Sequence, residues 1–210
     1  MKTPLVEPIV ALLAVFFVMG HAGDAMALSR EIAPDVQSGI VEKLLPHARV
    51  YMTGTGSKEV LLLADPFCEN SRKVYRLLLT RLEQIRTVNI LWVSVYPQKG
   101  SEVAAAVAMR MQAAGKGDSA LTKVFELTVP PPAELEKSRE NAMAMLREAF
   151  GPELGESNLQ RLQPEMDQLQ RNTNLAKEIG YTGTPHFIVD GRVVHGFSGP
   201  AIRILLKENP

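Results

Sequence analysis

Apolar residues along this chain fall first into a short continuous run, then into helical spacing, and then into a second run. Residues 59–64 are almost entirely apolar, which predicts a strand buried on both faces of a sheet. From residue 67 to 85 the apolar positions recur mostly at three- and four-residue steps, as in an amphipathic helix. Residues 88–95 are rich in β-branched side chains and predict a second buried strand. A strand, a helix and a strand in this order predict two parallel strands with a right-handed crossover.

The middle of the chain, residues 101–179, has helical character and no convincing strand pattern. Glycines and prolines divide it into four helices. We expect the fourth to run from about 157 to 179, with a break or kink at Pro164. The pattern therefore predicts an all-helical insertion at about 101–179.

The C-terminal part of the chain returns to a strand pattern. Residues 186–189 and 192–195 are two short β-rich runs separated by Asp190-Gly191. Asp-Gly favours a type I′ hairpin turn, in which both central residues have positive φ. A helix at about 199–207 follows. The order βαβ, helical insertion and ββα predicts an α/β fold for residues 58–210.

The first 27 residues have the three parts of a secretory signal peptide. Lys2 lies near the start, an apolar run occupies residues 9–19, and Ala25-Met26-Ala27 forms a small-x-small cleavage site. We expect cleavage after Ala27 and export to the periplasm. The apolar run is short against the roughly 20 residues that cross a bilayer. An uncleaved anchor is the alternative, and the only route by which we expect this protein to contact a membrane.

Composition excludes several functional classes. The chain has 23 basic and 23 acidic residues with no basic cluster, so it lacks the charge pattern of a nucleic-acid-binding protein. Its four histidines show no ligand spacing with acidic residues, and we expect no metal and no cofactor. Cys68 is the only cysteine, so it cannot form an intrachain disulfide. An unpaired cysteine in an oxidising compartment indicates intermolecular pairing or a reactive thiol.

Two short segments resemble the active site of the thioredoxin superfamily. Asp65-Pro66-Phe67-Cys68-Glu69-Asn70-Ser71 follows the first strand, and Gly183-Thr184-Pro185 precedes the hairpin. With the helical insertion and the signal peptide, the chain resembles Dsb-type periplasmic thiol-disulfide interchange proteins, most closely their C/G isomerase branch. This resemblance implies a thioredoxin-like fold. It also implies a cis peptide bond at Pro185 and a backbone edge at Thr184 that binds an extended client.

The sequence departs from that family at Ser71, where the resolving cysteine would be. A thiol at a helix N-terminus is favoured as thiolate, the nucleophile of disulfide exchange. Glu69 opposes thiolate formation and Arg72 favours it. The Ser71 hydroxyl would either hydrogen-bond the thiolate or be an ordinary helical surface residue. His186 would either tune the thiolate or be a strand residue that points at solvent or at a neighbour.

These residues leave three functions open. The first is a monothiol protein in which Cys68 forms mixed disulfides with exported client proteins, as an isomerase or reductase. Because a Cys-x-x-Ser site has no second sulfur, a client thiol or an external thiol must then resolve the adduct. The second is a redox-inactive binding or assembly protein of a secretion, pilus or conjugation system. The third is an intermolecular disulfide dimer through Cys68.

Residues 28–57 bear on the choice between these functions. We expect them to form a helix at about 28–47 and a turn marked by Gly54 and Gly56. The resemblance implies a separate N-terminal dimerisation domain in the C/G branch, and this segment is too short for one. The dimeric client cleft of that branch is therefore not expected here.

Overall fold

The computed structural model describes residues 32–33 and 38–207 of the 210-residue chain. The predicted signal peptide, residues 1–27, lies outside the described residues, as does Leu28. The described strands form one six-stranded sheet. They are β1 (Ile32–Ala33), β2 (Arg49–Thr53), β3 (Lys58–Ala64), β4 (Ile85–Trp92), β5 (His186–Val189) and β6 (Arg192–His195).

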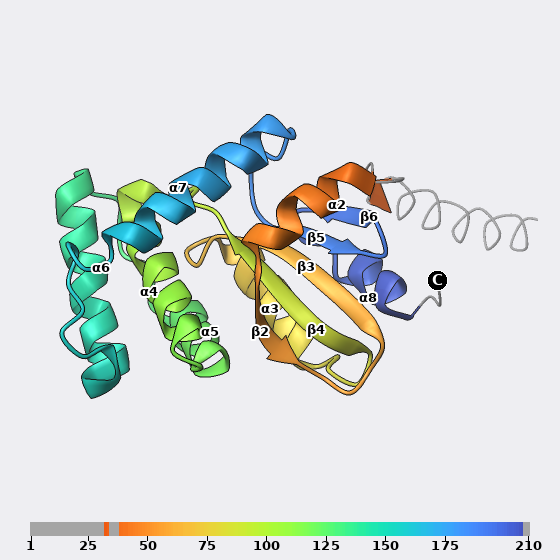
Figure 1. Cartoon of the computed structure of the whole chain (residues 1–210), viewed down its shortest axis with the longest axis horizontal. Helices are drawn as coiled ribbons and strands as arrows, with labels where there is room; N and C mark the ends of the chain where they lie inside the picture. The colour runs from red at the N-terminus through yellow and green to blue at the C-terminus, as the bar shows by residue number, and fades with distance from the viewer. Residues whose placement is uncertain (1–31, 34–37, 208–210) are drawn as a thin grey trace, which may run out of the picture.

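The sheet has the order β1-β6-β5-β3-β4-β2, in which β3 and β4 are neighbours (Figure 1). These two strands are parallel, as the strand-helix-strand pattern predicts. The hairpin strands β5 and β6 are antiparallel to each other, and β5 is antiparallel to β3. At the hairpin turn Asp190 has φ 50° and Gly191 has φ 74°, which confirms the predicted turn.

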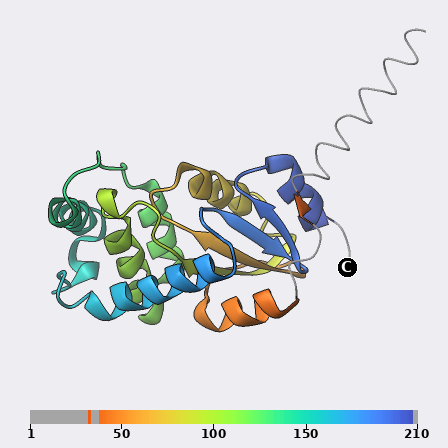
Figure 2. The ribbon, with the colours of Figure 1, turned by 90° about the horizontal axis from the view of Figure 1, so that it is seen from above.

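Helices cover both faces of this sheet, α3 and α8 on one side and α2 and α7 on the other (Figure 2). Alternate residues of the central strand β3 therefore enter different cores. Leu62 is buried with Val74 of α3, whereas Leu63 is buried with Leu44 of α2 and Ala176 of α7. This double burial explains why β3 has almost no polar positions. The helices of these two layers are α2 (Ser38–Leu44), α3 (Glu69–Leu79), α7 (Gln163–Glu178) and α8 (Gly199–Lys207).

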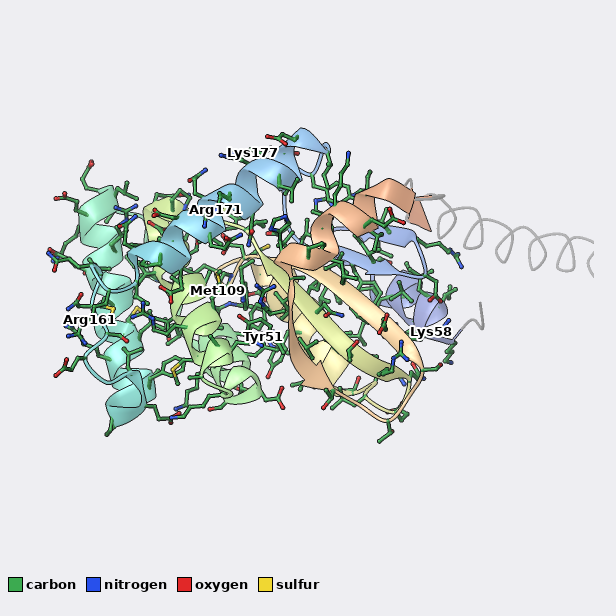
Figure 3. All side chains as sticks on the ribbon, in the orientation of Figure 1. Tyr51, Lys58, Met109, Arg161, Arg171 and Lys177 are labelled. Atoms are coloured by element: carbon green, nitrogen blue, oxygen red, sulfur yellow. The ribbon has the colours of Figure 1, made fainter. Side chains whose placement is uncertain are left out.

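The predicted helical insertion is present between β4 and β5. It contains α4 (Ser101–Ala113), α5 (Gly117–Glu126), α6 (Leu135–Phe150) and the long helix α7. The sheet meets the insertion at Trp92, whose Nε1 donates a hydrogen bond to the hydroxyl of Tyr51 at 2.8 Å. Trp92 also contacts Phe125 of α5, with ring centroids 5.5 Å apart. Tyr51 of β2 lies between the sheet and the insertion, while Lys58 lies at the far end of β3 (Figure 3). Among the described helices, none has both the length and the apolar character needed to cross a membrane.

Two expectations about element boundaries are wrong. Pro164 does not break the fourth helix but lies in the first turn of α7. Backbone N–H groups in the first turn have no partner within the helix, so a proline there costs no helical hydrogen bond. The helix after Cys68 ends at Leu79, so Ile85 begins β4 instead of ending α3. Both errors come from apolar residues in the adjoining turn and strand, which happen to continue the helical spacing.

The segment before the first predicted strand also contains more than a helix and a turn. Within the helix expected at about 28–47, the described residues form a strand at Ile32–Ala33, the helix α2 (Ser38–Leu44) and a 3-10 turn (Leu45–His47), while 28–31 and 34–37 lie outside the described residues. The strand β2 then pairs with β4, and the two-residue strand β1 pairs with β6. Both lie at sheet edges and are short, and β2 contains a register shift, so neither produces a clear apolar alternation.

Candidate active site

Cys68 is the N-cap residue of α3, at the end of the loop that leaves β3. Its N–H donates to the carbonyl of Asp65 at 3.1 Å, and its carbonyl accepts the N–H of Arg72 at 3.1 Å, which begins the helix. The side chain is only 4% exposed. The sulfur therefore lies at the positive end of the helix dipole in a largely covered position.

The segment around Pro185 contacts this sulfur directly. Antiparallel pairing of β3 with β5 places Leu63 opposite His186, which brings the preceding loop beside Cys68. The Cys68 Sγ lies 3.2 Å from the carbonyl oxygen of Thr184, to which the thiol donates a hydrogen bond. The Thr184–Pro185 peptide bond is cis, as the resemblance implies. The thiol and the backbone edge expected to bind a client are thus in contact.

Ser71 is fully buried, so the interpretation of it as a helical surface residue is wrong. Its Oγ accepts the backbone N–H of Asp65 at 3.4 Å. It lies one helical turn from Cys68, where the resolving sulfur of a Cys-x-x-Cys site would lie. A hydrogen bond from its hydroxyl to the Cys68 thiolate stays a prediction.

Asp65 is a buried carboxylate of this site that sequence reasoning missed. Its Oδ1 accepts the N–H of Phe67 at 2.7 Å, and its Oδ2 accepts the N–H of Val95 at 2.7 Å, the N–H of Tyr96 at 3.1 Å and the hydroxyl of Ser101 at 2.9 Å. Burial raises the pKa of Asp65, while these four donors act in the opposite direction. One side chain therefore holds the Cys68 loop and the loop after β4 together.

Glu69 and Arg72, the two expected tuning residues, lie in different environments. Arg72 is 6% exposed, and it donates from Nε to the carbonyl of Pro66 at 2.8 Å and from Nη1 to the carbonyl of Leu127 at 2.6 Å. Burial lowers the pKa of Arg72, although its charge also interacts favourably with Glu69, Asp65 and Cys68. Glu69 is solvent-exposed and lies 3.8 Å from Arg76. Solvent screens the effect of Glu69 on the sulfur more than that of the buried guanidinium.

Tyr96, in the loop after β4, is a second group that sequence reasoning missed. The negative charge of a Cys68 thiolate is the largest cause of a raised pKa at Tyr96, followed by burial. The ammonium of Lys99 lies 5.0 Å from the centre of the Tyr96 ring. In the sequence Tyr96 follows an apolar strand and precedes a proline, so it carried no sign of an interaction with residue 68.

His186 points at neighbouring side chains, which confirms one of its two interpretations. It is 7% exposed, its Nδ1 lies 2.8 Å from Nδ1 of His195, and its ring stacks on Tyr181 with centroids 4.2 Å apart. Burial, and next the charge of His195, lower its pKa to about 4. These contacts lie on the sheet face opposite α3, because the next residue, Phe187, is the one that enters the α3 side. A role for His186 in tuning Cys68 therefore stays a prediction without a contact to support it.

The described part of the chain contains no group of three or more His, Cys, Asp or Glu side chains placed to hold a metal ion.

Solved structures with the same fold include three bacterial proteins. A periplasmic thioredoxin-like protein from Salmonella enterica serovar Typhimurium has a TM-score of 0.59 at 15% identity, over 83% of this chain and 97% of its own. A linker-deletion mutant of ScsC from Proteus mirabilis has a TM-score of 0.58 at 14% identity, over 99% and 97%. A thioredoxin-like oxidoreductase from Silicibacter pomeroyi has a TM-score of 0.56 at 20% identity, over 80% and 98%. At these identities the likeness is one of fold.

Sequence comparison gives the family. Curated protein sequences give no match. The family model described as DSBA-like thioredoxin domain matches residues 52–201, which include β3, the Cys68 loop, the whole helical insertion and the β5–β6 hairpin. Together with the cis-proline beside the helix-capping thiol, this match identifies the chain as a member of the DSBA-like thioredoxin domain family.

Proposed function

We propose that this protein is a monothiol thiol-disulfide exchange protein of the periplasm, of the isomerase or reductase type, in which Cys68 is the nucleophile. One observation carries the proposal. The only sulfur of a cysteine in the chain lies at the N-terminus of α3 and 3.2 Å from the carbonyl that precedes a cis-proline. Membership of a thiol-disulfide exchange family supports the same chemistry.

The first step joins Cys68 to a client. The Cys68 thiolate attacks one sulfur of a client disulfide, a new S–S bond forms, and the displaced client sulfur leaves as a thiolate that takes a proton from water. Thr184 lies beside the sulfur, and its backbone would pair with the extended client segment. The product is a mixed disulfide between Cys68 and the client.

Release of the client requires a second thiol from outside this chain. Ser71 occupies the resolving position and offers no sulfur. If another thiolate of the client attacks, a different client disulfide forms and Cys68 leaves reduced, which is isomerisation without net oxidation or reduction. If two equivalents of a small external thiol act, the client disulfide is reduced and the small thiol is oxidised.

The periplasmic location rests on two supports. The first is the predicted signal peptide at residues 1–27. The second is that a similar structure from Salmonella enterica serovar Typhimurium is described as periplasmic. A reduced cysteine is useful in that oxidising compartment only if another thiol or a reducing partner maintains it.

Trapping of mixed disulfides tests the proposal. The full chain is expressed in a Gram-negative host, the periplasmic extract is quenched with acid and alkylated, and adducts are separated without reductant. We expect client adducts that disappear with dithiothreitol and in Cys68→Ala. Ser71→Ala, in which the thiol is intact, is the matched control and should keep the adducts. If no adduct depends on Cys68, the exchange function is wrong and the binding role of the fold gains support; an adduct only with a second copy of the chain would instead support the disulfide dimer.

A further inference from the structure

Asp65 joins the Cys68 loop to the rest of the molecule through every polar atom that it has. It is fully buried, directly after the last residue of β3. Its backbone N–H, its backbone carbonyl and both carboxylate oxygens all make hydrogen bonds. The partners belong to two segments that are far apart in the sequence, so this one residue connects them.

The first segment is the Cys68 loop with the start of α3. Oδ1 of Asp65 accepts the N–H of Phe67 at 2.7 Å, and the backbone carbonyl accepts the N–H of Cys68 at 3.1 Å. The backbone N–H of Asp65 donates to the hydroxyl oxygen of Ser71 at 3.4 Å. Cys68 is the N-cap residue of α3 but makes no side-chain capping hydrogen bond. The start of α3, and with it the sulfur, is therefore held by contacts to Asp65.

The second segment is the connection from β4 to the helical insertion. Oδ2 of Asp65 accepts the N–H of Val95 at 2.7 Å and the N–H of Tyr96 at 3.1 Å. It also accepts the hydroxyl of Ser101 at 2.9 Å. Ser101 is fully buried and is the first residue of α4. The place of the carboxylate, and through it that of the Cys68 loop, therefore depends on where the insertion begins.

The backbone edge opposite the sulfur is held by different contacts. The carbonyl of Thr184, 3.2 Å from the Cys68 sulfur, lies just before β5. Pairing of β5 with β3 fixes this segment, and the N–H of Gly196 donates to the carbonyl of Pro185 at 2.8 Å. The position of the sulfur relative to the client edge thus depends on two separate sets of contacts, and Asp65 makes the set on the sulfur side.

We propose that Asp65 is a positioning residue for the exchange reaction, which holds the Cys68 sulfur at the Thr184 edge in the orientation needed to attack a client disulfide. Attack requires the two reacting sulfur atoms to be aligned, and a misplacement of about 1 Å can cost about a hundredfold in rate. The inference rests on the proposed function, since it takes exchange at Cys68 as the reaction that Asp65 serves.

Two reactions of Cys68, measured on the purified protein at one pH, test the proposal. In the first, the thiolate attacks a short peptide whose single cysteine carries thionitrobenzoate. A disulfide forms between Cys68 and the peptide sulfur, and thionitrobenzoate leaves as a coloured thiolate. The second is alkylation by iodoacetamide, a small reagent that needs no alignment with the Thr184 edge. Both reactions consume the thiolate, so the ratio of their rate constants does not depend on how much thiolate is present.

Three variants are compared with the wild type by this ratio. Asp65→Asn places a donor against backbone N–H groups, and we expect the ratio of peptide attack to alkylation to fall about tenfold. Ser101→Ala removes one hydrogen bond to the carboxylate without changing a charge, and the ratio should fall about threefold. Ser138→Ala is the matched control. Ser138 is another buried serine of the insertion, and its hydroxyl donates to the carbonyl of Gln98, between β4 and α4, instead of to Asp65. Its ratio should equal that of the wild type.

Fluorescence of Trp92, the only tryptophan and a buried one, shows whether each variant is folded. If folded Asp65→Asn has the wild-type ratio, Asp65 stabilises the fold without positioning the sulfur, and the inference is wrong. If Asp65→Asn does not fold, Ser101→Ala decides in the same way. A fall in Ser138→Ala as large as that in Ser101→Ala would also overturn the inference, because it would assign the effect to the whole connection. A wild-type protein that is alkylated but releases no thionitrobenzoate would instead refute the exchange function, and this inference with it.

Discussion

Protonation of His186 is expected to destabilise the fold as the pH falls below about 6.5. In the folded protein burial and the neighbouring His195 lower the pKa of His186 from 6.5 to about 4. Since the folded state binds the proton less readily than the unfolded chain, the stabilisation is complete above pH 6.5 and is lost as the pH falls toward 4. At about 1.36 kcal/mol per pKa unit, the difference corresponds to about 3 kcal/mol.

Urea unfolding at pH 7.5 and at pH 4, at constant ionic strength, measures this loss. Carboxylates also titrate in this range, so the quantity to compare is the loss in the wild type minus the loss in His186→Phe, which keeps an aromatic ring against Tyr181. We expect a difference of about 3 kcal/mol. His195→Gln should keep most of it, because burial is the larger cause. Equal losses in the wild type and His186→Phe would refute the reasoning.

Two further predictions concern the loop that carries Cys68. Ser71→Cys restores a Cys-x-x-Cys site, and oxidation with glutathione disulfide should then form an intrachain disulfide with Cys68. The measurement is the loss of both titratable thiols. Two thiols that stay titratable would show that a cysteine at position 71 cannot reach the Cys68 sulfur. Asp65→Asn replaces one acceptor oxygen with a donor that faces backbone N–H groups. It should lower the free energy of unfolding by about 3 kcal/mol in urea at pH 7.5, and a loss under about 0.5 kcal/mol would mean that the loops reorganise without it.

The elements with strong patterns could be predicted from the sequence. The strand at residues 59–64 could be predicted because both faces of residues 60–64 are buried, which leaves a run in which only Glu59 is polar. The hairpin could be predicted because Asp190-Gly191 suits a turn with positive φ at both positions. The edge strand β2 could not be predicted from the apolar pattern, since it is only partly buried and its register shifts between Val50 and Met52.

The site was predictable where a residue's role follows from its own position in the chain. Cys68 begins a helix after a buried strand, so its place could be expected from local context, whereas the role of Pro185 before the hairpin came from the resemblance to the thioredoxin superfamily. Asp65 and Tyr96 lie 31 residues apart and meet only because parallel β3 and β4 end at the same edge of the sheet. In the sequence Asp65-Pro66 indicates no more than the end of a strand. Long-range hydrogen bonds of a side chain leave no periodic signal along the chain.

The burial of Ser71 changes what its replacement of a cysteine means. An exposed serine there would leave room for an incoming thiol to take the place of the missing sulfur. Ser71 is fully buried beneath Cys68, whose own side chain is 4% exposed. In the proposed mechanism, a resolving thiol therefore has to reach the Cys68 sulfur beside Thr184, where the client is expected to bind. The client disulfide and the resolving thiol would then reach the Cys68 sulfur from the same side. A second thiol on the bound client is already near the mixed disulfide, so it should attack faster than a free external thiol. If the proposed exchange function holds, we therefore expect isomerisation within a bound client to be favoured over its reduction.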